Sequence, residues 1–206
     1  MIVQPVVHVV DDDGAIRDAL VLLLEAAGHA ARAHADAASF LAVLDPAQPG
    51  CVVADVRMPG MSGLELLRHL GLSRIDLPVI IITGHADVAM AVEALKAGAA
   101  DFIEKPFDED VLLSAVERAL DRGARAFRER RHVDEIAARA ASLTPREREV
   151  MDLVVQGMPN KAVAVELSIS ARTVEIHRAR VMEKMAAASL SDLVRMALRL
   201  DEGDGV

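Results

Sequence analysis

Short runs of apolar residues alternate, in the first half of the chain, with segments whose apolar residues recur every three or four positions. The runs cover residues 6–10, 51–54, 79–82 and 101–104, and residues 30–34 form a weaker one. Such runs are typical of strands buried on both faces of a parallel sheet, and the spacing between them is helical. We therefore predict five β–α units in a doubly wound α/β sheet. The strand order 2-1-3-4-5 is expected because the first and third strands must flank the switch point.

The pattern changes after residues 1–121. Residues 122–142 are rich in Ala and Arg, which favours a helical or partly helical connector with a solvated arginine face; a nucleic-acid patch is the alternative. Residues 143–206 favour an all-α domain of four helices, and the first of them has Thr144 as N-cap and Glu147 to complete a capping box. The others are expected at 160–167, 171–185 and 190–200. A short helix, a tight turn and a longer helix predict a helix-turn-helix.

Composition and charge fit two domains with different partners. The net charge is −9, but residues 1–121 contain 8 basic and 19 acidic residues, a net charge of −11. Residues 143–206 contain 9 basic and 10 acidic residues, so their net charge is −1. Without the three acids of the C-terminal tail this net charge becomes +2. No apolar run reaches membrane-spanning length, no signal peptide is evident, and the only cysteine, Cys51, lies in an apolar run. We therefore expect a reduced, cytoplasmic protein.

Chemically active side chains stand at the ends of the predicted strands. Asp11 and Asp12 follow the first strand, Asp55 the third, Thr83 the fourth and Lys105 the fifth. The carboxyl ends of parallel strands meet at one edge of a sheet, which is where such folds bind ligands. Converging carboxylates repel one another, and a hard divalent cation such as Mg²⁺ relieves that repulsion.

This constellation, with DVRMPGMSG at 55–63, resembles the flavodoxin-like receiver domain of bacterial two-component response regulators. The resemblance implies that Asp55 takes a phosphoryl group from a phosphohistidine of a sensor histidine kinase. It also implies that Asp12, Asp55 and the Arg57 carbonyl ligate Mg²⁺ directly, while Asp11 acts mainly through water. Lys105 and the cation would neutralise the transferring oxygens. The Lys105–Pro106 bond is expected to be cis.

Three further positions take roles from the same resemblance. Thr83 would bond a phosphoryl oxygen, and Phe102 would turn inward as Thr83 moves. Arg57 and His85 lie two residues after the nucleophile and the hydroxyl, where they would tune the lifetime of the acyl phosphate. Two solvent-facing loop residues are an equally good interpretation of that pair. Phosphorylation is expected to create a symmetric dimer through a surface that includes Val92 and Lys96; pairing through the first and fifth helices is the alternative.

The last segment resembles the LuxR/NarL-type DNA-binding domain. The resemblance rests on LTPREREV at 143–150, GMPNK at 157–161 and SARTVEIH at 170–177. Together with GHADVAMAVEA at 84–94 and DFIEKPF at 101–107, the whole chain resembles the FixJ type of response regulator. That implies an oxygen-responsive sensor kinase, a double-stranded promoter, RNA polymerase as the target of activation, and nitrogen-fixation or microaerobic genes.

The long helix at 171–185 supplies the expected DNA contacts. The candidates for phosphate contact, and for base contact where the related regulators face bases, are Lys161, Arg172, Thr173, Glu175, Ile176, His177, Ala179 and Lys184. Glu175 suits cytosine N4 and Ile176 suits a thymine methyl group. The alternative is that Ile176 belongs to the core and that Glu175 pairs with Arg178 or Arg180.

Two other functions are considered. The segment VVDDDG at 9–14 also fits the opening motif of haloacid-dehalogenase-type phosphatases, with Asp11 as nucleophile. Those enzymes need a further acidic motif after the lysine, and only residues 108–110 and the acids of the C-terminal tail are available. An atypical, phosphorylation-independent regulator is the second alternative. Such regulators usually lack an acidic residue or the lysine, and here none is missing.

Overall fold

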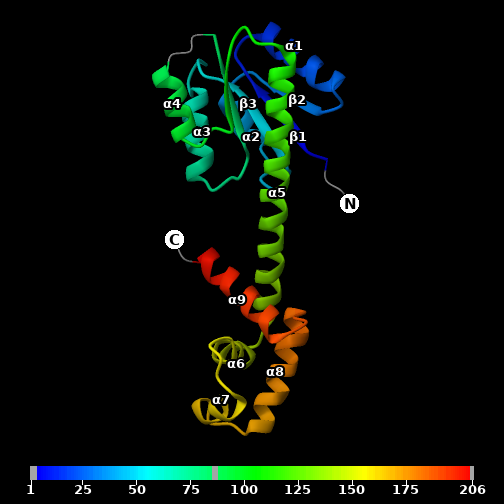
Figure 1. Cartoon of the computed structure of the whole chain (residues 1–206), viewed down its shortest axis with the longest axis vertical. Helices are drawn as coiled ribbons and strands as arrows, with labels where there is room; N and C mark the ends of the chain where they lie inside the picture. Colours follow the sequence, from blue (N-terminus) through cyan, green and yellow to red (C-terminus); the bar gives the residue numbers. More distant parts are fainter. Residues whose placement is uncertain (1–3, 85–87, 205–206) are drawn as a thin grey trace. The chain divides into compact units, whose positions relative to one another are not determined.

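A five-stranded parallel sheet with the order β2-β1-β3-β4-β5 forms the centre of the first half of the chain (Figure 1). The strands are β1 (Val6–Val10), β2 (Ala30–His34), β3 (Gly50–Asp55), β4 (Val79–Thr83) and β5 (Asp101–Glu104). The computed structural model describes residues 4–84 and 88–204, the last four of them as backbone only. The order of the strands confirms the doubly wound α/β sheet that the apolar runs predict.

Helices cover both faces of this sheet because successive strand residues point to opposite sides. Val9 of β1 and Val53 of β3 face α1 (Gly14–Ala26) and the first half of α5 (Glu109–Ala141). Their neighbours Val10, Val52 and Ala54 face the other layer, formed by α2 (Ala37–Val43), α3 (Gly63–Leu72) and α4 (Val88–Lys96). Because both faces are buried, the strands carry apolar residues at every position rather than at alternate ones.

The ends of these helices follow the capping residues in the sequence. Asp13, Asp36 and Ser62 are the N-caps of α1, α2 and α3, and the side chain of each accepts a bond from a backbone N–H of the first turn. Gly28 has φ +87° just after α1, which is the left-handed conformation that suits glycine. The α/β half of the fold is therefore encoded locally, by apolar runs bounded by caps and turns.

One long helix, α5, contains both the helix that follows β5 and residues 122–141 of the predicted connector, so the connector is helical, as the sequence allowed. It runs through 33 residues without a break and includes Gly123. The chain divides into two compact units, Met1–Arg128 and Glu129–Val206, so the division lies within α5. The predicted boundary at 121 lies inside this helix, and the predicted boundary at 142 lies one residue after its end at Ala141.

The second unit is all-α, as predicted. Its helices are the end of α5, α6 (Pro145–Val155), α7 (Asn160–Glu166), α8 (Ala171–Met185) and α9 (Leu190–Asp204). Thr144 and Glu147 form the predicted capping box of α6. The core contains Val150, Val174 and Leu193, and also Ile136 and Ala140 from α5. None of the helices in the described part of the chain is long and apolar enough to span a membrane.

Candidate functional site

The carboxylates of Asp11 and Asp55 lie side by side at one edge of the sheet. Strands β1 and β3 are paired, with Val10 opposite Ala54, so the residue after each of these is brought to the same level. Only 1% of Asp11 and 8% of Asp55 is exposed. Two buried carboxylates side by side need a positive charge between them, since water is excluded.

Lys105 supplies that charge. Its backbone N–H donates to the Thr83 carbonyl (2.7 Å), which fixes the lysine just beyond β5. Its Nζ lies 2.8 Å from Asp11 Oδ2 and 2.8 Å from Asp55 Oδ1. Burial acts to lower the pKa of Lys105, but its hydrogen bonds with Asp11 and Asp55 outweigh this, and the pKa is raised above its usual value. The ammonium is thus charged at neutral pH and is shared by both acids. The Lys105–Pro106 bond is cis, as expected.

The second oxygen of Asp55 is held by the loop that follows β3. The Arg57 backbone N–H donates to Asp55 Oδ2 at 2.6 Å, while the Arg57 residue itself is exposed. The start of α3 lies close to the end of β3. A β-carbon added to Gly63 would lie 2.3 Å from the Asp55 carbonyl oxygen, so only glycine fits there. The loop thereby fixes the Asp55 carboxylate in one orientation.

Thr83 and Phe102 lie next to this site. Thr83 ends β4 and is 1% exposed. Phe102 is half-buried on β5, opposite Ile81 of β4, and packs against the core layer of α2, α3 and α4. His85 falls outside the described residues. Thr83 and Phe102, the two residues of the predicted switch, therefore lie on the neighbouring strands β4 and β5.

The oxygen donors at this edge suit a hard cation by their chemistry. Asp11, Asp55 and the carbonyl of Arg57 offer the kind of ligand that Mg²⁺ prefers, and Asp12 is exposed beside them. In the described part of the chain, no three His, Cys, Asp or Glu side chains are gathered closely enough to hold a metal ion. The lysine ammonium instead occupies the position between the two buried carboxylates.

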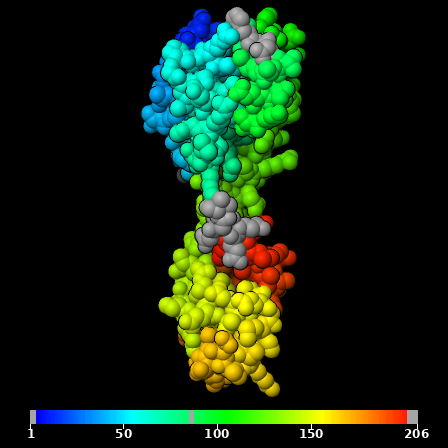
Figure 2. All heavy atoms as spheres, turned by 90° about the vertical axis from the view of Figure 1, so that its left-hand side faces the viewer, coloured from blue at the N-terminus to red at the C-terminus, as the bar shows by residue number. Residues whose placement is uncertain are grey.

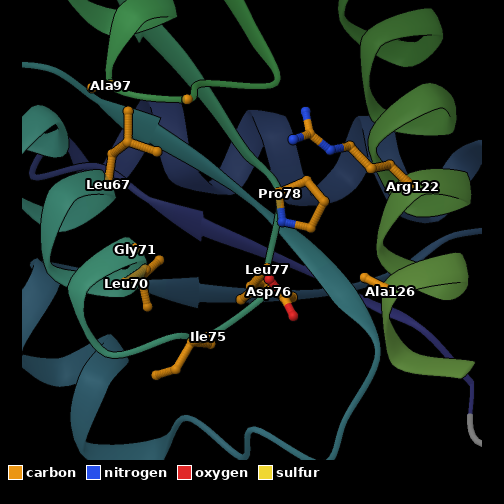
Figure 3. Close-up of a pocket in the computed structure, with 11 residues that line it drawn as sticks. Leu67, Leu70, Gly71, Ile75, Asp76, Leu77, Pro78, Ala97, Arg122 and Ala126 are labelled. Atoms are coloured by element: carbon orange, nitrogen blue, oxygen red, sulfur yellow. The ribbon is translucent and has the colours of Figure 1, made fainter. Parts of the chain in front are cut away.

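A separate cavity of about 240 Å³ lies at the opposite edge of the sheet, near the start of β4. Its walls are mainly apolar, with Leu67 from α3, Pro78 before β4 and Ala126 from α5, and the Arg122 side chain extends across it from α5 (Figure 3). The cavity contains none of the residues at the carboxylate edge.

The predicted DNA-contacting residues differ in their solvent exposure and in the contacts that they make within the protein. Arg172, Glu175 and Ala179 on α8 and Lys161 on α7 are exposed. Ile176 is 44% exposed, so the alternative that it belongs to the core does not hold. Glu175 pairs with Arg172 at 3.2 Å, rather than with Arg178 or Arg180. Thr173 and His177 are half-buried, and among the described residues His177 Nδ1 is buried without a hydrogen-bond partner.

Lys184 is engaged within its own domain. Its Nζ lies 2.6 Å from Glu147 Oε2 and 3.1 Å from the Ser142 carbonyl oxygen. Glu147 is 2% exposed, and its bonds with Lys184 and the Thr144 backbone lower its pKa to about 2. This ion pair ties the end of α8 to the start of α6. The sequence spacing on α8 could not reveal it, because the partner lies 37 residues away.

Two family models match the chain. Residues 7–117 match the response regulator receiver domain, and residues 141–197 match the bacterial regulatory proteins of the luxR family. Transcriptional regulatory protein FixJ of Azorhizobium caulinodans is 52% identical over 192 residues, which cover 93% of this chain and 91% of that protein. FixJ of Rhizobium meliloti is also 52% identical over 192 residues, covering 93% and 94%.

A solved structure, that of the response regulator StyR, matches 95% of this chain and 99% of its own, with a TM-score of 0.83 and 41% identity. The chain therefore belongs to the two-component response regulators of the FixJ type. It is a phosphorylation-dependent, DNA-binding regulator and not an enzyme, which excludes the phosphatase alternative.

Proposed function

We propose that Asp55 accepts a phosphoryl group from a phosphohistidine of a sensor histidine kinase. A carboxylate oxygen of Asp55 bonds to phosphorus, the phosphorus–nitrogen bond breaks, and the imidazole leaves. The observation that carries this proposal is the Lys105 ammonium, 2.8 Å from both Asp55 Oδ1 and Asp11 Oδ2. An ammonium already at the nucleophile offsets the negative charge that a phosphoryl group brings. The buried Thr83 at the end of β4 is the proposed donor to a phosphoryl oxygen.

We also propose Mg²⁺ as the cofactor of this site. Asp11, Asp12, Asp55 and the Arg57 carbonyl would hold it, and when bound it would supply further positive charge against the phosphoryl oxygens. Arg57 is exposed beside Asp55, and we propose that it and His85 tune the lifetime of the acyl phosphate.

Labelling with radioactive acetyl phosphate in Mg²⁺ tests the assignment of Asp55. Asp55→Asn should take up no label, because the amide lacks the anionic nucleophile. Asp76→Asn, which alters an exposed acid at the opposite edge of the sheet, is the matched control and should be labelled like the wild type. Label on Asp55→Asn at the wild-type level would show that the phosphoacceptor is another residue.

The proposed response to phosphorylation is a symmetric dimer that includes Val92 and Lys96. The route runs from Thr83 to Phe102, which lies in the strand beside α4. Val92 is 44% exposed, Leu95 is 56% exposed and Lys96 follows one helical turn after Val92, so α4 presents apolar and basic groups together. Figure 2 looks onto the face that α3 and α4 form. A doubly charged phosphoryl group can shift such an equilibrium by a few kcal/mol.

Sedimentation of the phosphorylated protein tests this interface. Val92→Asp should abolish dimerisation and leave phosphoryl uptake at Asp55 intact, because the introduced charges would face each other across a two-fold axis. Leu72→Asp, at an 87% exposed position at the end of α3, is the control and should dimerise normally. A dimer of wild-type affinity from Val92→Asp would favour the alternative through α1 and α5.

We propose that α8 enters the major groove of promoter DNA. Lys161 and Arg172 would meet phosphates, Thr173 and His177 are further phosphate candidates, and Glu175, Ile176 and Ala179 would face base edges. The ammonium of Lys184 is bonded to Glu147, so we do not expect this predicted residue to contact a phosphate. The exposure of Ile176 and Glu175 supports this orientation. A two-fold dimer would place two such helices on a symmetric site.

The proposed biological role is activation of nitrogen-fixation or microaerobic genes through RNA polymerase, in the cytoplasm, in response to an oxygen-sensing kinase. It is supported by the similarity to the FixJ regulators over most of the chain. Phosphotransfer from a panel of purified kinases tests the signal: rapid transfer from an oxygen-sensing kinase is expected, and preference for a kinase of another signal would contradict this role.

A further inference from the structure

An arginine of α1 is hydrogen-bonded to the main chain of Asp11. Arg17 lies in the first turns of α1, and its Nη1 donates to the Asp11 carbonyl oxygen at 2.6 Å. The residue is half-buried. The side chain runs back over the start of its own helix, where a β-carbon added to Gly14 would lie 3.5 Å from Arg17 Nη2.

This bond acts on the peptide that joins the two neighbouring acids. The Asp11 carbonyl belongs to the planar group that also contains the Asp12 nitrogen, so fixing the oxygen fixes the plane from which the Asp12 side chain departs. The rest of Asp11 is held as well: Oδ1 accepts from the Asp13 N–H (2.9 Å) and Oδ2 from Lys105 Nζ (2.8 Å). Arg17 provides the cationic contact on the main-chain side.

Helix stability does not explain an arginine at this place. The N-terminus of a helix carries partial positive charge, so a cation in its first turns is unfavourable by about 0.3–1 kcal/mol. The carbonyl of Asp11 and the neighbouring acids offset this effect. A residue that departs from a local rule at the edge of a functional site indicates a role in that site.

We propose that Arg17 is a positioning residue, which holds the Asp11–Asp12 peptide so that both carboxylates are presented to a divalent cation. Arg17 itself does not touch the cation. The inference rests on the proposed function, in which these acids hold Mg²⁺. A simple charge effect predicts the reverse, because a guanidinium near a cation site repels the cation and its removal would tighten binding.

Isothermal titration of the full-length protein with Mg²⁺ separates these outcomes. Arg17→Met should raise the Kd for Mg²⁺ by about tenfold, as is usual when an outer-shell partner of a metal ligand is lost. Arg17→Lys keeps the charge but not the planar fork, and should weaken binding by a smaller factor. Arg125→Met removes an exposed arginine of α5 and should bind Mg²⁺ like the wild type.

Thermal unfolding in EDTA is measured alongside, to show that each variant is folded without the cation. Equal or tighter Mg²⁺ binding by a folded Arg17→Met overturns the proposal. If Arg17→Met does not fold, Arg17→Lys decides, and wild-type affinity in that variant overturns it. A wild-type protein that does not bind Mg²⁺ at all would instead refute the proposed cofactor, and the role of Arg17 with it.

Discussion

Gly123 of α5 passes so close to Gly50 at the start of β3 that a β-carbon on Gly123 would lie 2.4 Å from the Gly50 carbonyl oxygen. Helix and strand thus meet backbone to backbone at the edge of the sheet opposite the carboxylates. Glycine in a helix is normally a weak point, since it is less favourable than alanine by about 1 kcal/mol. Here it is the residue that permits the contact, and the helix continues through it.

Gly123→Ala should therefore lower the free energy of unfolding of the receiver unit, by about 1–3 kcal/mol, because the added methyl group meets backbone that cannot move aside easily. Gly71→Ala is the matched control. It lies in α3, and its β-carbon would meet nothing within 4 Å, so it should stabilise by about 0.5–1 kcal/mol. Urea unfolding of both variants measures the difference. A Gly123→Ala variant that is more stable than the wild type would show that the backbone at the start of β3 moves to make room for the methyl group.

Acid should weaken the receiver unit through His8. The residue His8 is 4% exposed, its Nδ1 lies 3.0 Å from His34 Nε2, and Phe40 packs on both rings. Burial, then the charges of His34 and Arg32, lower the pKa of His8 from 6.5 to about 4. Because the pKa of His8 is lowered in the folded state, folding disfavours the protonated ring. The contribution of neutral His8 to the free energy of unfolding is therefore fully present above pH 6.5, declines as the pH falls below that value, and is lost by about pH 4.

The expected loss from this one group is about 3 kcal/mol, at 1.36 kcal/mol for each pKa unit. His8→Gln should be less stable at pH 7 but should show a smaller decrease between pH 6.5 and 4. His69→Gln, at an exposed position of α3, should keep the wild-type profile. Urea midpoints at several pH values measure this, and an unchanged profile in His8→Gln would assign the acid sensitivity to other groups.

The DNA-binding unit should require the end of α5 for its stability. Ile136 is fully buried in its core, and Arg139 of α5 donates to the Met185 carbonyl of α8 at 3.3 Å. A fragment of residues 129–204 should unfold cooperatively, whereas residues 143–204, which follow the domain boundary expected from the sequence, should be markedly less stable. Ile136→Ala in the longer fragment should cost about 2–5 kcal/mol. Equal urea midpoints for the two fragments would contradict this.

Replacement of Lys184 by alanine and replacement of Arg172 by alanine should have different effects on stability and on the salt dependence of DNA binding. Lys184→Ala leaves the buried Glu147 carboxylate without its ammonium, so it should lower the stability of the second unit and leave the salt dependence of DNA binding unchanged. Arg172→Ala should leave stability unchanged and reduce the slope of log K against log salt by about 1, if this exposed residue meets a phosphate. Electrophoretic or anisotropy titrations at several salt concentrations give the slopes. A reduced slope in Lys184→Ala would show that Lys184 does contact a phosphate, as its position on α8 predicted.

Much of this protein could be determined from its sequence because the signals are local. Unbroken apolar runs predicted the parallel sheet, the need for the first and third strands to flank the switch point predicted its order, and Thr144 with Glu147 predicted where α6 begins. The placement of Asp11, Asp55 and Lys105 at strand ends was sufficient to predict that they meet, since parallel strands bring their carboxyl ends to one edge.

The remaining features depend on contacts between residues far apart in the chain. Gly123 falls in the predicted connector, and only the structure shows that it lies within one continuous helix and passes close to Gly50. Lys184 has the spacing of a DNA contact on α8, yet its ammonium is bonded to Glu147 of another helix. Ile136 resembles a connector residue, and only the packing of α6, α8 and α9 shows that it belongs to a core. Periodicity reveals which face of a helix is apolar, but only the tertiary structure decides what that face meets.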